Sequence, residues 1–216
     1  MGVHPVNRGT RGDARSVAAL LAEAFEGDPV SRWLLPDAVE RRRRHMRFLL
    51  VFVEHVLDRG EVQLYFDGGY AGAALWLHVD PAQQAPGPDL GRIEDALGPD
   101  AFERFQLLDK QMHNHHVMDV PHAYLPFVGV APDRQGLGIG RRLLSVKLEL
   151  LDAEETPAYL EASSERSCHL YQRLGFRPHG EPFTLPDGPT LYPMWREVPQ
   201  YRHPDNSRWP SSASQR

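Results

Sequence analysis

A glycine-rich segment between an apolar run and an amphipathic run constrains the fold of this chain more than any other feature. The apolar run ends at Val130, a Pro-Asp pair then predicts a turn, and residues 135–140 (Gln-Gly-Leu-Gly-Ile-Gly) lead directly into a helical pattern. A strand, a glycine loop and a helix in this order direct backbone N–H groups and the positive end of a helix dipole at one place. Glycines also let a ligand approach the backbone closely. We therefore predict a phosphate-binding loop.

Two common phosphate-binding loops do not fit this segment. A dinucleotide fingerprint has the pattern G-x-G-x-x-G; Gly136 and Gly138 match it, but Arg141 stands at the third position. A P-loop ends in Gly-Lys followed by Ser or Thr, whereas two arginines follow Gly140 here. The pattern that remains is Q-x-x-G-x-G, beginning at Gln135.

Two segments together resemble a known family. Residues 128–140 (V-G-V-A-P-D-R-Q-G-L-G-I-G) resemble motif A of the GNAT-type N-acetyltransferases, and residues 159–176 (Y-L-E-A-S-S-E-R-S-C-H-L-Y-Q-R-L-G-F) resemble motif B, in the family's order and separation. The resemblance extends over residues 3–198 in element order. It is most specific over 123–180, where it is greatest to puromycin N-acetyltransferase and its relatives. It implies an acetyl-CoA-dependent N-acetyltransferase, and we expect no metal.

The element pattern is that of an α/β (α+β) domain with a mixed sheet. We predict strands at 3–6, 61–66, 70–78, 123–130, 157–161, 176–183 and 191–197. We predict helices at 13–25, 39–58, 91–97, 99–117, 138–155 and 164–174. Residues 1–198 are expected to form a single acetyltransferase domain. The Pro-, Ser- and Arg-rich residues 199–216 are expected to be a disordered tail.

Pro126 lies inside the predicted strand 123–130. Proline cannot donate a ladder hydrogen bond, so it argues against an ordinary central strand. The resemblance implies the GNAT fold, a mixed central sheet flanked by helices, whose middle strands splay apart to admit the cofactor. A bulged or splayed strand would accommodate Pro126. The alternative is an edge strand.

Composition limits the function classes. The net charge is −5 and hydrophobic residues make up 41% of the 216, which favours one domain with a sizeable core and neither a nucleic-acid nor a membrane partner. The single cysteine fits a reducing compartment, and we see no apolar run of membrane-spanning length and no signal-peptide core. We expect a cytoplasmic enzyme whose partner is a small-molecule amine. A homodimer stays open.

Coenzyme binding is expected to depend largely on backbone groups. Loop N–H groups suit a pyrophosphate, and exposed backbone at the end of strand 123–130 can pair with the amides of the pantetheine arm. Ser167 stands where the family usually has an asparagine, so that contact is either lost or made through water. The predicted cofactor-binding residues are Val128, Gly129, Val130, Gln135, Gly136, Leu137, Gly138, Ile139, Gly140, Arg141 and Ser167.

Two residues are candidates for proton transfer. By the resemblance, Tyr171 lies beside the thioester sulfur, where a neutral phenol with a pKa of about 10 can protonate a thiolate. The alternative for Tyr171 is a packed aromatic side chain. Glu161 ends a predicted strand beside the expected reaction centre and can accept the amine proton directly or through water. Its alternative is a structural acceptor for loose backbone N–H groups where strands separate.

For several other residues that could suggest a site, a structural or solvent-exposed role is favoured over a functional one. A histidine group invites a metal site, but it lacks a matching set of carboxylates or cysteines, so pocket-wall or hydrogen-bonded histidines are favoured. Its members are His113, His115, His116 and His122. We expect Cys168 to be a packing residue rather than an acyl carrier. The basic run at 41–44 is expected to be a solvated helical face.

Two alternatives to an acetyltransferase stay open. One is a non-catalytic acyl-CoA sensor that regulates a partner, against which Tyr171 argues. The other keeps the fold but uses another donor, such as succinyl-CoA. Residues 79–118 are expected to shape the acceptor pocket, and no motif in them identifies the acceptor.

Overall fold

A mixed sheet covered by helices on both faces forms the core of the chain. The computed structural model describes residues 6–83 and 86–199. Its helices are α1 (Ala14–Ala24), α2 (Pro29–Leu34), α3 (Ala38–Arg59), α4 (Leu90–Leu97), α5 (Pro99–His115), α6 (Ile139–Ala153) and α7 (Glu165–Gln172), with 3₁₀ turns at Arg11–Asp13 and Pro132–Arg134. Its strands are β1 (Val6–Arg8), β2 (Gly60–Phe66), β3 (Tyr70–Val79), β4 (His122–Val130), β5 (Ala158–Ala162), β6 (Arg177–Pro178), β7 (Phe183–Thr184) and β8 (Thr190–Arg196).

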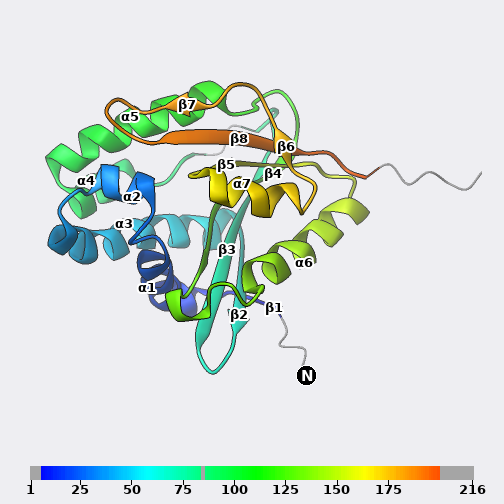
Figure 1. The fold of residues 1–216 in the computed structure, drawn as a ribbon, viewed down its shortest axis with the longest axis horizontal. Helices are drawn as coiled ribbons and strands as arrows, with labels where there is room; N and C mark the ends of the chain where they lie inside the picture. The colour runs from blue at the N-terminus through cyan, green and yellow to red at the C-terminus, as the bar shows by residue number, and fades with distance from the viewer. Residues whose placement is uncertain (1–5, 84–85, 200–216) are drawn as a thin grey trace, which may run out of the picture.

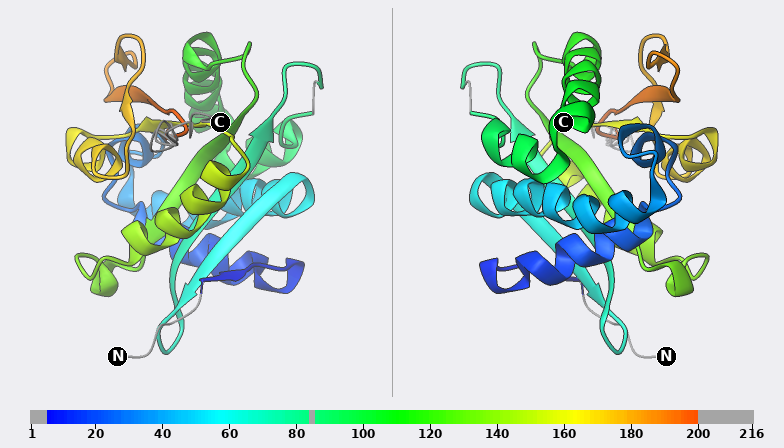
Figure 2. Two further views of the ribbon diagram at one scale, coloured as in Figure 1. Left: turned by 90° about the vertical axis from the view of Figure 1, so that its right-hand side faces the viewer. Right: turned by 90° about the vertical axis from the view of Figure 1, so that its left-hand side faces the viewer.

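The sheet has the order β1-β2-β3-β4-β5-β8-β6, and β7 pairs with β8. β4 and β5 are parallel, and the other named pairs are antiparallel. Helices α1, α3 and α4 pack on one face around Leu49, and α6 and α7 pack on the other around Leu143. The opposed views in Figure 2 place α3 in front on one side and α6 in front on the other. β3 is buried from Ala71 to Trp76 because both faces are covered.

The middle strands of the sheet separate. β4 and β5 pair only at Ala123–Ala158 and Tyr124–Tyr159, whereas β3 accompanies β4 as far as Val130. Figure 1 shows β8 running across the direction of β2 and β3. The β3–β4 register shifts beside Pro126, so a bulge accommodates the missing N–H. The expected splayed strand is confirmed, and the edge-strand alternative is wrong.

The described part of the first strand spans Val6–Arg8, and residues 3–5 of the predicted strand lie outside the described residues. Two element predictions need correction. The predicted strand 176–183 is two short strands, β6 and β7, because both pair only locally with β8. The helix α2 was not predicted. Of the predicted tail, residues 200–216 lie outside the described residues.

Part of the basic run on α3 is buried, which corrects the expectation of a solvated face. Arg41 is 7% exposed, and its Nη1 donates to the carbonyls of Leu35 and Pro36 at 2.6 and 3.2 Å. Arg44 donates to the carbonyl of Leu97 at 2.5 Å. These arginines therefore bind carbonyl groups that α2 and α4 leave unpaired at their C-terminal ends.

His45 should make the fold sensitive to acid. It is 3% exposed, lies 3.2 Å from Ser31 Oγ, and burial lowers its pKa to about 4. A histidine in the unfolded chain has a pKa of about 6.5. The stability that the neutral His45 contributes is therefore fully present above that pH and is lost as the pH falls towards 4. Between pH 7 and 5 we expect this group to lower the free energy of unfolding by about 2 kcal/mol. Urea unfolding of the wild type and of His45→Gln at pH 7 and pH 5 measures this loss. The free energy of unfolding should fall less between the two pH values in the variant, and equal falls would contradict the prediction.

Candidate active site

The opening between β4 and β5 is the candidate active site. Beyond the Tyr124–Tyr159 pair, the edge of β4 that faces β5 has no strand partner among the described elements. The chain leaves the open end of β4 into the glycine loop and α6, while β5 leads into α7. Both motifs therefore meet at one gap, as the carboxyl ends of parallel neighbours require.

The glycine loop is open towards solvent. Gly136 and Gly138 both have a φ of +80°, and a Cβ built on either meets no atom within 4 Å. This backbone conformation favours glycine, and Gly138 forms the N-cap of α6. The Gln135 side chain donates to the carbonyl of Val130 at 3.2 Å, which ties the loop to the end of β4. The loop therefore leaves room for a phosphate against its N–H groups, next to the positive end of a 15-residue helix.

Several predicted coenzyme residues can contribute only backbone groups. The side chains of Val128, Val130 and Ile139 pack in the core on the α6 side. Gly129 permits close packing of α1, because a Cβ there would lie 2.8 Å from Leu21. Leu137, by contrast, is 66% exposed in the loop. Gly140 lies in the first turn of α6, and Arg141 follows it with an exposed side chain.

Ser167 is engaged within its own helix. Its hydroxyl donates to the carbonyl of Ser164 at 2.7 Å, and its N–H donates to the Ser164 hydroxyl, the N-cap of α7, at 3.3 Å. The Ser167 hydroxyl thus has a local partner at the N-terminus of the helix.

Tyr171 projects from α7 into the packed region beside the gap. It is 9% exposed and packs against Phe176 with ring centroids 5.9 Å apart. Burial raises the pKa of Tyr171, and the nearby charges of Asp28 and Cys168 add to the effect. The phenol is therefore protonated throughout the neutral range and can donate a proton. Tyr171 and the valines of β4 belong to one apolar cluster.

Asp28 is a residue near the site that sequence reasoning missed. Its carboxylate accepts from the N–H groups of Val30 and Ser31 at 2.9 and 3.2 Å, and from the Ser163 hydroxyl at 2.5 Å. Burial raises the pKa of Asp28. The signal for a cap was present, since Asp followed by Pro is typical of a helix start. Asp28 therefore joins α2 to the segment between β5 and α7.

Glu161 lies on β5 in a buried aromatic cluster. Its side chain is 2% exposed, and Oε1 lies 3.5 Å from Nδ1 of His116 and accepts no hydrogen bond from the described residues. Burial raises the pKa of both Tyr124 and Tyr159, and the charge of Glu161 and hydrogen bonding of each phenol to the Glu161 carboxyl group add to the effect. The carboxyl group therefore lies among neutral phenols and close to the imidazole of His116.

The four histidines of the predicted group do not lie together in the structure. His113 is exposed, and His115 stacks on Phe183 with ring centroids 4.2 Å apart. His116 and His122 contact each other, with their Nε2 atoms 3.1 Å apart. Within the described ranges, no three His, Cys, Asp or Glu side chains are grouped as a metal site. Cys168 is half-buried against the α6–α7 cluster, and burial raises the pKa of its thiol.

Comparisons with known proteins agree with this geometry. The acetyltransferase (GNAT) family profile matches residues 102–176. The mycothiol acetyltransferase of Streptomyces griseus is 32% identical over 210 residues, which cover 82% of this chain and 67% of that protein. The chain belongs to the GNAT acetyltransferase family. Its fold is the GNAT fold and its family activity is N-acetyl transfer, for which GNAT enzymes use acetyl-CoA.

Solved structures share the architecture. A Corynebacterium glutamicum structure described as histone acetyltransferase HPA2 and related acetyltransferase superposes with a TM-score of 0.66 at 25% identity, covering 89% of this chain and 95% of that chain. Arylalkylamine N-acetyltransferase 2 of Aedes aegypti superposes with a TM-score of 0.64 at 13% identity, covering 90% and 98% of the two chains. Among the described residues, no helix is long and apolar enough to cross a membrane.

Proposed function

We propose that this GNAT protein transfers an acetyl group from acetyl-CoA to a primary amine of a small molecule, by direct attack in a ternary complex. The observation that carries the proposal is the gap between β4 and β5, which has an open glycine loop at the end of β4 and the protonated phenol of Tyr171 beside it. A thioester placed in the gap would have a phosphate cradle at one end and a proton donor near the sulfur.

The chain's own groups suffice for the proposed transfer. Loop N–H groups from Gly136 to Arg141 would hold the pyrophosphate, and the free edge of β4 would pair with the pantetheine amides. A backbone N–H near Val128 would stabilise the oxyanion that forms when the amine attacks. Tyr171 would donate its proton as the C–S bond breaks, and the acceptor's proton would leave towards Glu161 and its neighbours.

A hollow beside α2 is our candidate entrance for the acceptor. It has a volume of about 560 Å³ and lies next to Asp28. It is lined by Gly27, Pro29, Arg32, Trp33, Pro36, Arg104, Asp187, Gly188 and Pro189. Arg104 comes from the segment 79–118, but most of the lining comes from α2 and the β7–β8 turn. The acceptor pocket would therefore be built largely outside the segment expected to shape it.

The names of related proteins support a small acceptor. One relative is named a mycothiol acetyltransferase, and one structural neighbour is an arylalkylamine N-acetyltransferase. The motif resemblance to puromycin N-acetyltransferase points to an amine of antibiotic-like or aromatic character. We propose an amine of this size and leave its identity to a screen. A sensor without catalysis and an enzyme with another acyl donor are outcomes of that screen.

Release of free CoA tests the proposal directly. The purified protein, acetyl-CoA and a panel of amines including puromycin, tryptamine and agmatine should release thiol in proportion to acetylated amine. Acetyl-CoA should also raise the melting temperature. Binding without release for any amine would favour the sensor, and faster release from succinyl-CoA would change the donor. Absence of binding to any acyl-CoA would refute the proposal.

Gly138→Ala should weaken acetyl-CoA binding at least tenfold. The new methyl group would project into open space where we place the phosphate, and a Cβ at a φ of +80° costs roughly 1 kcal/mol by itself. Gly180→Ala is the matched control, because Gly180 has a φ of +66° and equally open surroundings. Titration calorimetry with acetyl-CoA should show a weaker Kd for the first variant alone. Equal affinities would remove the loop from the coenzyme site.

A further inference from the structure

The hydrogen bonds of His122 fix its tautomer. His122 is 0% exposed. Burial lowers the pKa of its side chain to about 4, so the ring is neutral. Nδ1 lies 2.7 Å from the carbonyl oxygen of Val120, which can only accept. Nδ1 therefore carries the single ring proton, and Nε2 of His122 presents a lone pair.

This lone pair determines the tautomer of the neighbouring His116 ring. Nε2 of His116 lies 3.1 Å from Nε2 of His122, and a hydrogen bond at that distance needs one donor. Since the His122 nitrogen is the acceptor, His116 must donate through its own Nε2–H. In the neutral ring, Nδ1 of His116 then has no proton.

The unprotonated Nδ1 of His116 faces a buried carboxyl oxygen of Glu161. Nδ1 of His116 and Oε1 of Glu161 lie 3.5 Å apart, and both present lone pairs to the same space. Oε1 is buried and accepts no hydrogen bond from the described residues. Leaving such an oxygen unsatisfied costs free energy, and one proton between the two atoms would satisfy both.

We infer that His116 and Glu161 act together as the general base, taking one proton from the acceptor amine into the space between His116 Nδ1 and Glu161 Oε1. The inference rests on the proposed function and names its base. The ammonium of the acceptor gives this proton to Nδ1 and becomes the free amine. The imidazolium that forms donates Nδ1–H to Glu161 and Nε2–H to His122. The amine nitrogen then bonds to the thioester carbon, and Tyr171 protonates the sulfur as the C–S bond breaks. The acylated nitrogen passes its second proton through solvent to the Tyr171 phenolate, which leaves a neutral amide, free CoA and one proton on the His116–Glu161 pair.

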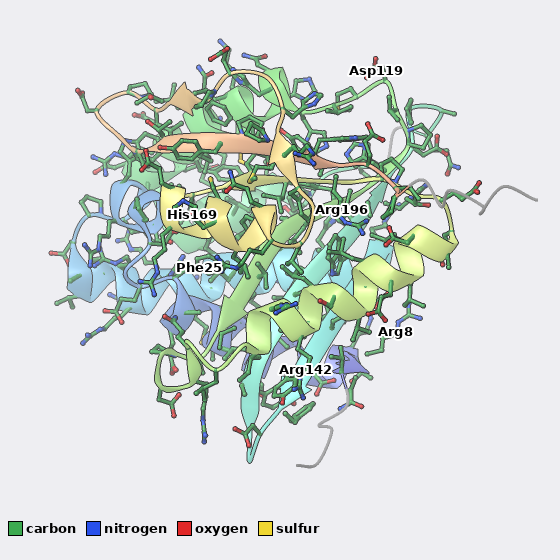
Figure 3. All side chains as sticks on the ribbon, turned by 45° about the vertical axis from the view of Figure 1, so that its right-hand side comes forward. Arg8, Phe25, Asp119, Arg142, His169 and Arg196 are labelled. Carbon is green, nitrogen blue, oxygen red and sulfur yellow. The ribbon has the colours of Figure 1, made fainter. Side chains whose placement is uncertain are left out.

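The arrangement divides the roles of the three side chains. His116 is 11% exposed at the end of α5, so its ring is accessible to a proton donor, whereas the side chain of Glu161 is 2% exposed. Glu161 stabilises the imidazolium, and His122 holds the ring in the tautomer that leaves Nδ1 free. The loop that joins His116 to His122 carries Asp119, labelled in Figure 3. Other titratable groups around the pair are Tyr124, Tyr159, His115, His78 and Asp109.

Nitrogen chemical shifts of the histidine rings test the geometry without substrate. In ¹⁵N-labelled wild type above pH 8, His122 should be the Nδ1–H tautomer and His116 the Nε2–H tautomer. Lowering the pH should protonate Nδ1 of His116 while His122 stays neutral. An Nε2–H tautomer at His122 would overturn the inference whether or not an acceptor has been found.

His116→Gln tests the chemistry. With the best amine of the panel, we expect kcat to fall about 100-fold and the acid limb of its pH profile to disappear, with the KM for acetyl-CoA unchanged. His113→Gln, on the exposed face of α5, is the matched control and should behave as wild type. Unchanged acetyl-CoA binding shows that the variant is folded and that the coenzyme site is intact. Wild-type kcat with an unaltered acid limb in His116→Gln would assign the base to Glu161 alone and overturn the pairing.

Discussion

Tyr171→Phe should lower kcat about 1000-fold and leave the affinity for acetyl-CoA almost unchanged. The substitution removes one oxygen, while the ring keeps its packing against Phe176. Without the phenol, the sulfur leaves as a thiolate or takes a proton from water, and a positioned acid contributes 10²–10⁴-fold. Steady-state kinetics and calorimetry on the same preparation separate the two parameters.

The pH profile of the wild type sharpens this prediction. Burial raises the pKa of Tyr171, so the phenol stays protonated as the pH rises through 9, and its role should not limit kcat on the alkaline side in that range. Tyr70→Phe is the control, because the Tyr70 hydroxyl donates to Asp13 at 2.5 Å, in the part of the sheet around the β2–β3 hairpin. It should lower stability and leave kcat intact. A Tyr171→Phe enzyme with wild-type kcat at every pH would exclude the phenol as the acid.

The glycine loop and the two motif helices were predictable because their signals are local. Glycines at positive φ, the turn before them and the amphipathic run after them all lie within residues 130–153, so they need no long-range contact to be recognised. Pro126 also predicted how its strand pairs with a neighbour, because a residue without an N–H cannot sit in a regular central ladder. The sequence could therefore predict the splayed strand before the partner strand was known.

Helix α2 escaped prediction for a physical reason. It has six residues, which is too short for a 3.6-residue periodicity to show. The Asp28-Pro29 pair is also an ambiguous signal, because the same two residues can end one helix and begin the next. Only the structure shows that Asp28 accepts three hydrogen bonds and lies near Tyr171.

The His116–Glu161 pair could not be predicted from spacing. His116 follows α5, His122 begins β4 and Glu161 lies on β5, so the three meet only when the parallel β4–β5 pair forms. The spacing that attracted attention, His113 to His116, places the first residue on an exposed surface. Glu161 was recognised as a candidate from its motif, but its partner depended on tertiary structure.

Arg196→Ala should cost the fold about 3 kcal/mol, the largest stability effect we expect from a single charged residue. Arg196 is 7% exposed, and its guanidinium binds both carboxylate oxygens of Asp152 at 2.5 and 2.7 Å. Its Nε also donates to the carbonyl of Leu174 at 3.0 Å. Figure 3 shows Arg196 between β8 and α6. Removing one partner of a buried pair costs 3–5 kcal/mol, and the partial exposure of Asp152 favours the lower end.

The same arginine connects the fold to the site. The carbonyl that it binds lies in the turn that ends α7, where the N–H groups of Leu174 and Phe176 donate to the Tyr171 carbonyl at 2.9 and 3.0 Å. Arg196→Lys keeps the charge but loses the bidentate fork, so about half of the stability should return. Arg177→Ala, at an exposed position on β6, is the control and should stay within ~0.5 kcal/mol of wild type. Urea unfolding of the three variants measures these differences. An Arg196→Ala protein as stable as Arg177→Ala would mean that Arg196 does not hold α6 and the end of α7 against the sheet.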